Sequence, residues 1–470
     1  MASSFGGINT ALTSLYAQRR ALDVTGQNIA NANTEGYSRQ RVEMQSQVGS
    51  ISPAMYAQTD GLGTGVAVTD VQRLRDQYME NRSRTEHGNS AYLTNQTAAY
   101  AEIEDVFAEP GSTALQAQLH DMWDAWGDVA NNPQLPAARA ALIQQSNTVT
   151  DGLNYAHEAL SQQWGQNRKQ LAAYAEEVNT AAETIAKLND SIVRAKATGV
   201  TVNELEDRRD IAVLSLSKLS GAIASARPNG AMDVFVGNST LVSEFTTRKL
   251  EVTGAERLDD QTADPVQLRW TDTKTAAGAG GTMGAMADTL TTVIPDISMD
   301  LDEVAKALAD KVNTAHAAGF SKDGSTKLNF FEGTTAGTIR VAISTPDKVA
   351  TSKTAGALDG SVAAQLAQTI AATDPLDPLK PAEPSPDLLY QSMIGGLGVA
   401  AQASARRNEI QATVTEQVDA AREAQSGVNL DEEMTNLLTY QRGYEAASRV
   451  LTTIDSMLDQ LINRTGLVGR

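Results

Sequence analysis

Hydrophobic residues recur every seven positions near both ends of this chain, and no other feature of the sequence limits its fold as much. A strict repeat of seven is typical of helices that wrap around one another along a narrow seam. The N-terminal repeat alone would also suit an ordinary amphipathic helix, and the longer C-terminal repeat decides between these alternatives. The predicted assembly seam consists of Phe5, Ile8, Leu12, Leu15, Leu22 and Ile29 in the first segment and Leu430, Leu437, Tyr440, Tyr444, Ala447, Leu451, Ile454, Leu458 and Leu461 in the second.

Each terminal helix carries an apolar stripe that it cannot bury by itself, because isolated helices are marginally stable in water. We therefore expect the two helices to pack on each other and to bury their remaining apolar surface against neighbouring molecules. The C-terminal helix has a clear start, since Asn429 is a typical cap and Glu432 follows three residues later.

The region between the two ends predicts a helical rod with a smaller β-rich part. Helical spacing of apolar residues continues through 90–225 and includes a long helix over 138–196 and another over 203–220. Alternating apolar residues begin near 228, which favours short strands. The rest of the middle region is expected to form, in order, a helix near 297–317, a strand at 338–344, a proline-marked connector at 375–386 and a helix over 390–424.

These patterns predict a mainly α fold with a smaller β-rich outer insertion. The N- and C-terminal helices would pair as a coiled coil, and a long-helix bundle domain and an α+β outer domain would follow. The expected domains are a terminal assembly domain of 1–45 with 428–470, a helical rod domain of 46–227 with 352–427, and an outer insertion of 228–351 that contains the helix near 297–317.

The net charge of −19 lies almost entirely in the middle of the chain, because residues 1–45 carry +1 and residues 428–470 carry −2. Lys and Arg form no cluster, so nucleic-acid binding is not expected. The absence of Cys excludes disulfides, thiolate metal sites and cysteine nucleophiles. The sequence predicts no membrane span, and its start lacks the pattern of a secretory signal, so export would need a route without a cleaved leader.

No motif in the chain predicts catalysis, a cofactor or a metal. The glycine cluster at 278–284 lacks the Lys-Ser/Thr end of a phosphate-binding loop, which favours a flexible linker. Asp323 has no ladder of further calcium ligands. The charged run at 204–210 is interpreted as structural or subunit-contact residues that pair along their own helix. The histidines are scattered and are interpreted as structural or exposed: His87, His120, His157 and His316.

Two longer segments, one near each end, resemble the signatures of bacterial flagellar axial proteins, which are the rod, hook and hook-associated proteins. The first contains Asn28, Ile29, Ala30, Asn31, Asn33, Thr34, Gly36 and Tyr37, and the second contains Asn429, Leu430, Asp431, Glu432, Glu433, Tyr440 and Gln441. Within this group the chain resembles the flagellar hook-associated protein 1 family, through its Leu-Asp-Glu-Glu at 430–433 and its long helical middle.

The resemblance implies a structural subunit, and not an enzyme, that is exported to the hook–filament junction of the bacterial flagellum. It implies a ring of about eleven copies, with the terminal helices lining a central channel. The implied partners are other copies of the chain, the hook protein, a second hook–filament junction protein and an export chaperone on the C-terminal helix. No cofactor, nucleic acid or membrane insertion is implied.

Two alternatives remain open at this point. A hook or distal-rod subunit would share the terminal motifs, although the long helical middle disfavours it. A flagellum-associated hydrolase would need a catalytic constellation within 228–385, and no such pattern is evident there.

Overall fold

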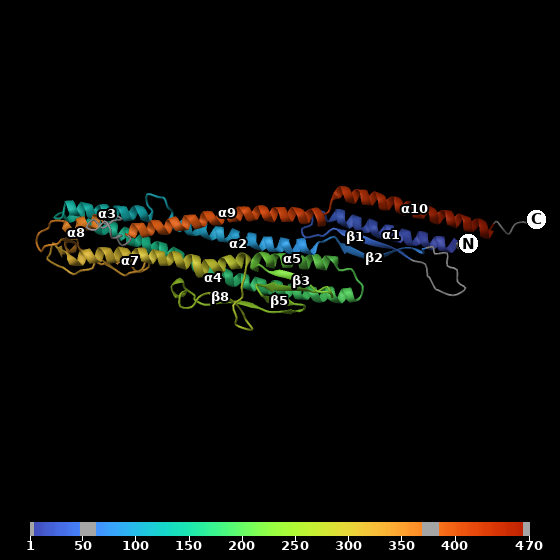
Figure 1. Ribbon diagram of the computed structural model, residues 1–470, viewed down its shortest axis with the longest axis horizontal. Helices are drawn as coiled ribbons and strands as arrows, with labels where there is room; N and C mark the ends of the chain where they lie inside the picture. The colour runs from blue at the N-terminus through green and yellow to red at the C-terminus, as the bar shows by residue number, and fades with distance from the viewer. Residues whose placement is uncertain (1–3, 48–62, 369–384, 464–470) are drawn as a thin grey trace, which may run out of the picture.

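The computed structural model describes residues 4–47, 63–368 and 385–463 of the chain. The molecule is elongated, with helices α1 and α10 at one end (Figure 1). The other long helices form a rod, and a small β-rich part lies along one side of it. The helices are α1 (Ser4–Ala30), α2 (Gln77–Phe107), α3 (Leu115–Asn131), α4 (Pro136–Ala197), α5 (Asn203–Ser220), α6 (Gly281–Asp288), α7 (Ile294–Ala318), α8 (Ser361–Ala367), α9 (Pro386–Ser426) and α10 (Leu430–Asn463).

The strands are short and all of their pairings are antiparallel. Strands β3 to β6 form a four-stranded sheet in chain order, and the others form two-stranded ribbons. Their bounds are β1 (Gln40–Gln47), β2 (Gly65–Arg73), β3 (Ile223–Ala226), β4 (Met232–Val236), β5 (Ser239–Ser243), β6 (Thr246–Thr247), β7 (Leu250–Thr253), β8 (Gln267–Trp270), β9 (Phe320–Ser321), β10 (Phe331–Glu332), β11 (Arg340–Val341) and β12 (Ala350–Ser352).

Helix α4 is the central element of the rod and has 62 residues. It begins at Pro136, which lacks an N–H at a position where a helix leaves that group unpaired. Large side chains repeat along its buried face, which packs against α3, α5 and α7. The predicted helix over 138–196 is thus confirmed, and α5 has the predicted bounds. The buried face consists of Leu142, Val149, Leu153, Leu160, Trp164, Leu171, Val178, Ile185 and Ile192.

The β-rich part is fastened to α4 by two buried asparagines. Asn189 donates to the carbonyls of Met232 (2.8 Å) and Glu244 (2.7 Å) and accepts from the N–H of Met232. Asn179 pairs in the same way with both backbone groups of Leu250. The strand alternation that was predicted near 228 is observed in β4, where every second residue is buried. These asparagines satisfy strand groups that would otherwise lie unpaired beside a helix.

The structure differs from the sequence-based predictions in four places. The 278–284 segment is not a linker: it leads into α6, whose first residues are buried against α2 and α5. The packing is close, because a Cβ on Gly221 would lie 2.8 Å from Cα of Gly280. The hairpin β1–β2 was not predicted, and the strand at 338–344 is reduced to β11. The helix near 297–317 is α7, which lies in the rod against α4 and α9 (Figure 1).

One hydrophobic core runs through the rod and the β-rich part, and a second, much smaller cluster lies beside α1. The prediction of a mainly helical fold with a smaller β content is confirmed. The division into three domains stays a prediction. Most of the proline-marked connector lies outside the described residues, and its last residue, Pro386, begins α9.

Candidate assembly site at the terminal helices

Helices α1 and α10 lie side by side and run in opposite directions (Figure 1). Three contacts define their register. A Cβ on Gly7 would lie 3.1 Å from Cδ1 of Ile454, a Cβ on Gly443 would lie 2.9 Å from the Gln18 side chain, and Asn28 donates to Glu433 at 3.0 Å. The residue numbers of each pair add up to the same value, so the pairing keeps one register over its whole length.

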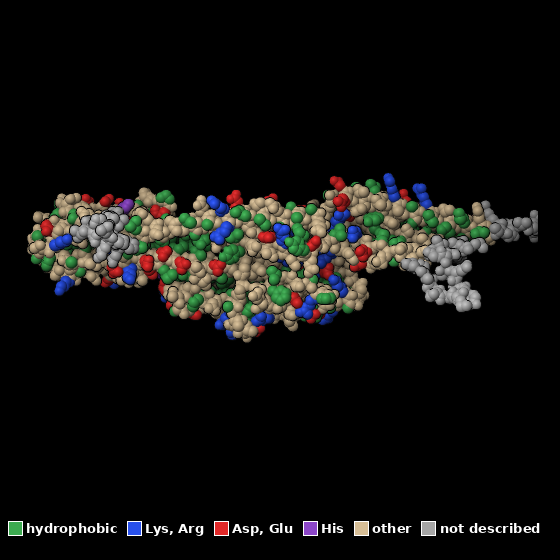
Figure 2. Space-filling view, in the orientation of Figure 1, with side chains coloured by type: hydrophobic (Ala, Val, Ile, Leu, Met, Phe, Trp, Pro, Cys, Tyr) green, Lys and Arg blue, Asp and Glu red, His purple; other side chains and the backbone are tan. Residues whose placement is uncertain are grey.

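The predicted seam of α10 lies largely on the side that faces α1. Ala447 is buried, and Leu437, Tyr440, Leu451, Ile454 and Leu458 are half-buried. Leu430, Tyr444 and Leu461 are exposed, with 40–55% of their surface accessible. Leu430 begins the helix, and Leu461 lies in its last turn. Hydrophobic side chains therefore remain at the surface of this end of the molecule (Figure 2).

The predicted seam of α1 is less buried than a second row that sequence reasoning missed. Ile8, Leu15, Leu22 and Ile29 are half-buried, Leu12 is exposed, and the side chain of Phe5 lies outside the described part. The missed row has small side chains that allow the hairpin β1–β2 and α10 to approach closely. Its signal in the sequence is the spacing of four and three residues between Ala17, Ala21, Val24 and Asn28.

Asn28 is the centre of the contacts made by the first signature segment. Its side-chain oxygen accepts from Gln40 N–H (3.0 Å) and from the Tyr37 hydroxyl (2.9 Å). Its amide nitrogen donates to the Gln40 carbonyl (2.9 Å) and to Glu433 (3.0 Å). Every hydrogen-bonding position of an asparagine side chain is thus filled. Burial, together with the nearby charges of Asp207, Glu433 and Glu204, raises the pKa of Tyr37 to about 12, so its hydroxyl stays a donor.

Glu433 of the second signature segment is buried and binds the first segment directly. It contacts Arg39 at 2.7 Å, while the exposed Glu432 contacts another nitrogen of the same guanidinium at 2.7 Å. Asn429 caps α10 by accepting from the N–H groups of Asp431 and Glu432. The predicted cap is therefore confirmed, although the Glu432 side chain binds Arg39.

The 204–210 run of α5 forms the other half of this connection. Asp210 is buried and lies within 3.2 Å of a guanidinium nitrogen of Arg73, Arg75 and Arg84. Burial acts to raise the pKa of Asp210, but these three cations hold it below its ordinary value. The run thus pairs with distant arginines and is largely buried, so the prediction of ion pairs along its own helix is wrong and the structural interpretation is supported.

We call these contacts the ionic junction, defined as Asn28, Ser38, Arg39, Arg73, Arg75, Arg84, Asp207, Asp210 and Glu433. Ser38 connects its two halves because it precedes Arg39 in the chain and also binds the α5 half. It donates to Asp207 (2.7 Å) and accepts from Arg75 (2.6 Å). The hairpin is also held to α5 by Asn203, which donates to Gln40 and to the carbonyl of Val71. The two signature segments and α5 thus meet at one place, where the terminal helices join the rod.

The four histidines lie in different surroundings. His316 is buried, His87 and His157 are half-buried beside acidic residues, and His120 is exposed. Within the described ranges, no three or more His, Cys, Asp or Glu side chains are grouped so that they could hold a metal ion. No helix in the part of the chain that the structure describes is long and apolar enough to cross a membrane.

Comparison with known proteins agrees with this architecture. Residues 100–331 match the family model of the flagellar hook-associated protein FlgK helical domain. Residues 8–37 match that of the flagella basal body rod protein, and residues 422–464 match that of the flagellar basal body rod FlgEFG protein C-terminal region. The two matches to basal body rod proteins thus fall on α1 and α10. The match to the FlgK helical domain falls on the helical body of this molecule.

Two proteins of known name and one solved structure are similar to the chain. Flagellar hook-associated protein 1 of Bacillus subtilis (strain 168) is 29% identical over 100% of both chains. The protein of that name from Salmonella typhimurium is 27% identical over 69% of this chain and 59% of its own length. The flagellar hook junction protein FlgK from Burkholderia pseudomallei shares the fold, with a TM-score of 0.63 and 13% identity, over 73% of this chain and 99% of that one. By these matches the chain is similar over its whole length to flagellar hook-associated protein 1 of Bacillus subtilis, and residues 100–331 resemble the helical domain of FlgK.

Proposed function

We propose that this chain is a non-enzymatic subunit that assembles on the distal end of the hook and connects it to the filament. The observation that supports the proposal best is that hydrophobic side chains are buried more completely in the rod than at the terminal helices. The rod buries its large side chains in one continuous core, while α1 and α10 pair with each other and leave Leu430 and Tyr444 exposed. Apolar surface of this kind at one end of a rod is typical of subunits that complete their packing against neighbours.

The ionic junction would make the proposed subunit stiff where its terminal helices meet the rod. It joins the terminal helices to α5 through buried, charge-assisted hydrogen bonds, which are shorter and stronger than neutral ones. A load applied to α1 and α10 would therefore pass into the rod without a flexible hinge. In the proposed assembly about eleven copies form a ring, with the terminal helices around a central channel.

The other proposed partners follow from the same arrangement. The hook protein would meet the terminal helices from below, and a second junction protein would meet the rod. Before export along a route without a cleaved leader, a chaperone would cover the apolar stripe of α10. A hook or distal-rod subunit remains the alternative function, and the long α4 within the residues matched to the helical domain favours the junction protein.

Deletion of the gene tests the proposed position. We expect cells that build complete hooks, carry no filaments and release filament protein into the medium, as seen by electron microscopy and by analysis of the culture supernatant. Cells that lack hooks altogether would contradict the proposal and favour the alternative.

Substitution within the seam tests the proposed mode of assembly. Replacing Leu451 and Leu458 with Asp places two charges between α1 and α10, so we expect loss of incorporation into flagella while the circular dichroism of the rod is kept. The matched control replaces the exposed Thr452 and Gln460 with Asp, which adds the same charge outside the seam. Normal filaments in the Leu451→Asp, Leu458→Asp variant would refute the role of the seam.

A further inference from the structure

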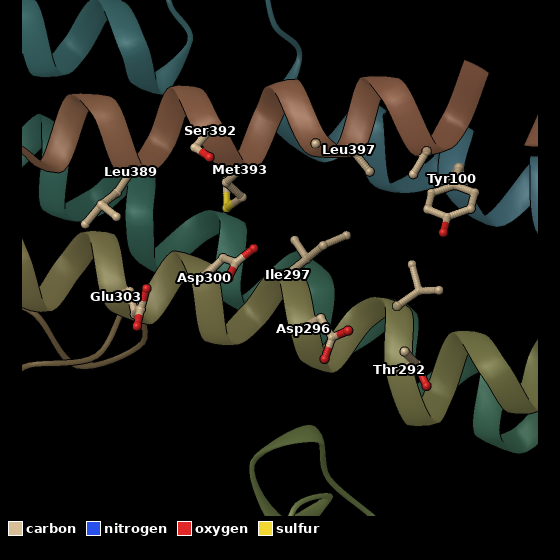
Figure 3. Close-up of a pocket in the computed structure, with 13 residues that line it drawn as sticks. Tyr100, Thr292, Asp296, Ile297, Asp300, Glu303, Leu389, Ser392, Met393 and Leu397 are labelled. Atoms are coloured by element: carbon tan, nitrogen blue, oxygen red, sulfur yellow. The ribbon is translucent and has the colours of Figure 1, made fainter. Parts of the chain in front are cut away.

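A groove of about 420 Å³ lies between α7 and α9, far from the ionic junction (Figure 3). Its α9 wall is apolar, with Leu389, Met393 and Leu397 along it. Gly396 lines the same wall, and the space beside its Cα is open, so another backbone could approach closely. Ser392 lies on this wall as well and is exposed.

The α7 wall of the groove is acidic. Asp296, Asp300 and Glu303 lie along it at spacings of four and three residues, and Figure 3 shows them in a row opposite Met393 and Leu397. All three side chains are exposed, and no Lys, Arg or His in the described ranges forms an ion pair with them. Acidic side chains are spaced along this part of the surface in Figure 2.

The three carboxylates repel one another. Partial burial, followed by the charges of Glu303 and Asp296, raises the pKa of Asp300 above its ordinary value. A cationic partner would relieve this repulsion, because its positive charges would lie beside the three carboxylates. The spacing spans two turns of α7, or about 10 Å, which matches basic residues on one edge of another helix.

We propose that this groove is the docking site for an amphipathic helix of a different flagellar protein, one that places Lys or Arg against Asp296, Asp300 and Glu303 and apolar side chains against Met393 and Leu397. Helix-in-groove recognition uses this combination of an apolar face and a charged edge. A second copy of this chain is disfavoured as the occupant, because its 57 acidic residues outnumber its 38 basic ones. The inference rests on the proposed function, since it places the partner in the flagellum.

A cross-linking experiment tests the proposal in the full-length protein. The chain contains no Cys, so Ser392→Cys creates a single attachment point inside the groove. Flagella that carry this variant are labelled with a benzophenone maleimide and irradiated, and the cross-linked peptide is identified by mass spectrometry. We expect a peptide from another flagellar protein with Lys or Arg at spacings of three or four residues.

Neutralisation of the acidic wall is the second arm of the experiment. In the Ser392→Cys background, Asp296→Asn, Asp300→Asn and Glu303→Gln together should reduce the cross-link yield at least about threefold, which corresponds to three exposed ion pairs of small individual value. The matched control neutralises Asp121, Asp124 and Asp128, which lie exposed on α3 with similar spacing and outside the groove. This control should leave the yield unchanged.

The failure of the docking proposal can be told apart from the failure of the proposed function. If filaments assemble on the labelled variant but the cross-linked peptide comes from this chain, lacks basic residues or is absent, the docking proposal is overturned and the junction role stands. A yield that does not respond to neutralisation of the acidic wall overturns it as well. If the gene deletion abolishes hooks, the proposed function itself fails.

Discussion

The rod and the pair of terminal helices are both helical, but they differ in how completely they bury their hydrophobic residues. In the rod, Trp123, Trp126 and Trp164 are fully buried within one continuous core. Beside α1 the core is a small cluster of Ala21, Val24, Val42 and Val71. We therefore expect the rod to be stable by itself, and the terminal helices to depend on the ionic junction and, in the proposed assembly, on neighbouring subunits.

The largest expected effect compares one leucine in each region. Leu153 in α4 is fully buried, so Leu153→Ala should lower the free energy of unfolding by about 2–5 kcal/mol through lost contacts and a cavity. Leu451 in α10 is half-buried, so Leu451→Ala should cost only about 1 kcal/mol in the isolated protein. Urea unfolding followed by circular dichroism measures both values. Equal losses would remove the distinction between the two regions.

An intermediate effect is expected at the ionic junction. Glu433→Gln removes the charge that pairs with Arg39 and alters the acceptor of Asn28, and we expect a loss of about 1–3 kcal/mol. The loss should appear as faster hydrogen exchange in α10, with little change in α4. Glu432→Gln is the matched control, because this exposed partner of the same arginine should contribute less than about 1 kcal/mol. Faster exchange along α4 in the Glu433 variant would mean that the two regions unfold as one.

The smallest effect concerns the pH dependence of the rod. His316 accepts a hydrogen bond from Ala350 N–H at Nε2 and donates from Nδ1 to the Leu328 carbonyl, so it is neutral when folded. Burial lowers its pKa below 6.5. The unfolded chain therefore binds more protons, and this contribution to stability is full above about pH 6.5 and is lost as the pH falls through the folded pKa.

We expect His316→Gln to unfold more easily at neutral pH but to show a weaker dependence of stability on pH below about 6.5. Denaturation curves at several pH values test this expectation, and His120→Gln at an exposed position serves as the control. An unchanged slope in the His316 variant would show that other groups cause the acid sensitivity of the rod.

The helices of the rod could be predicted because their apolar residues are large and regularly spaced. Trp164, Leu171 and Val178 repeat along α4 strictly enough to predict its bounds within two residues. The charged run at 204–210 shows the limit of this reasoning, since its partners Arg73, Arg75 and Arg84 come from β2, α2 and the residues between them. A pattern within one helix does not reveal which distant cations will reach it.

The contacts between α1 and α10 could be predicted only in part, for a similar reason. The large residues predicted on α10 lie mostly on the side that faces α1, whereas the most buried residues of α1 include Ala17 and Ala21, whose small side chains give a weak periodic signal. The strand β1 was missed because only Gln40 and Val42 are buried along it. The backbone contact between Gly221 and Gly280 likewise depends on how three helices pack, which no local pattern encodes.

The antiparallel pairing of α1 with α10 also has a consequence for how the chain folds. Asn28 and Glu433, which bond to each other, are 405 residues apart. Closing a loop of that length in an unfolded chain costs on the order of 5 kcal/mol in entropy. Once α2 and α9 have packed side by side, the two ends are already close, and their effective concentration is high. Helices α1 and α10 should therefore pair late, after α2 and α9 have packed, so that their contact forms only when the helices between them are in place.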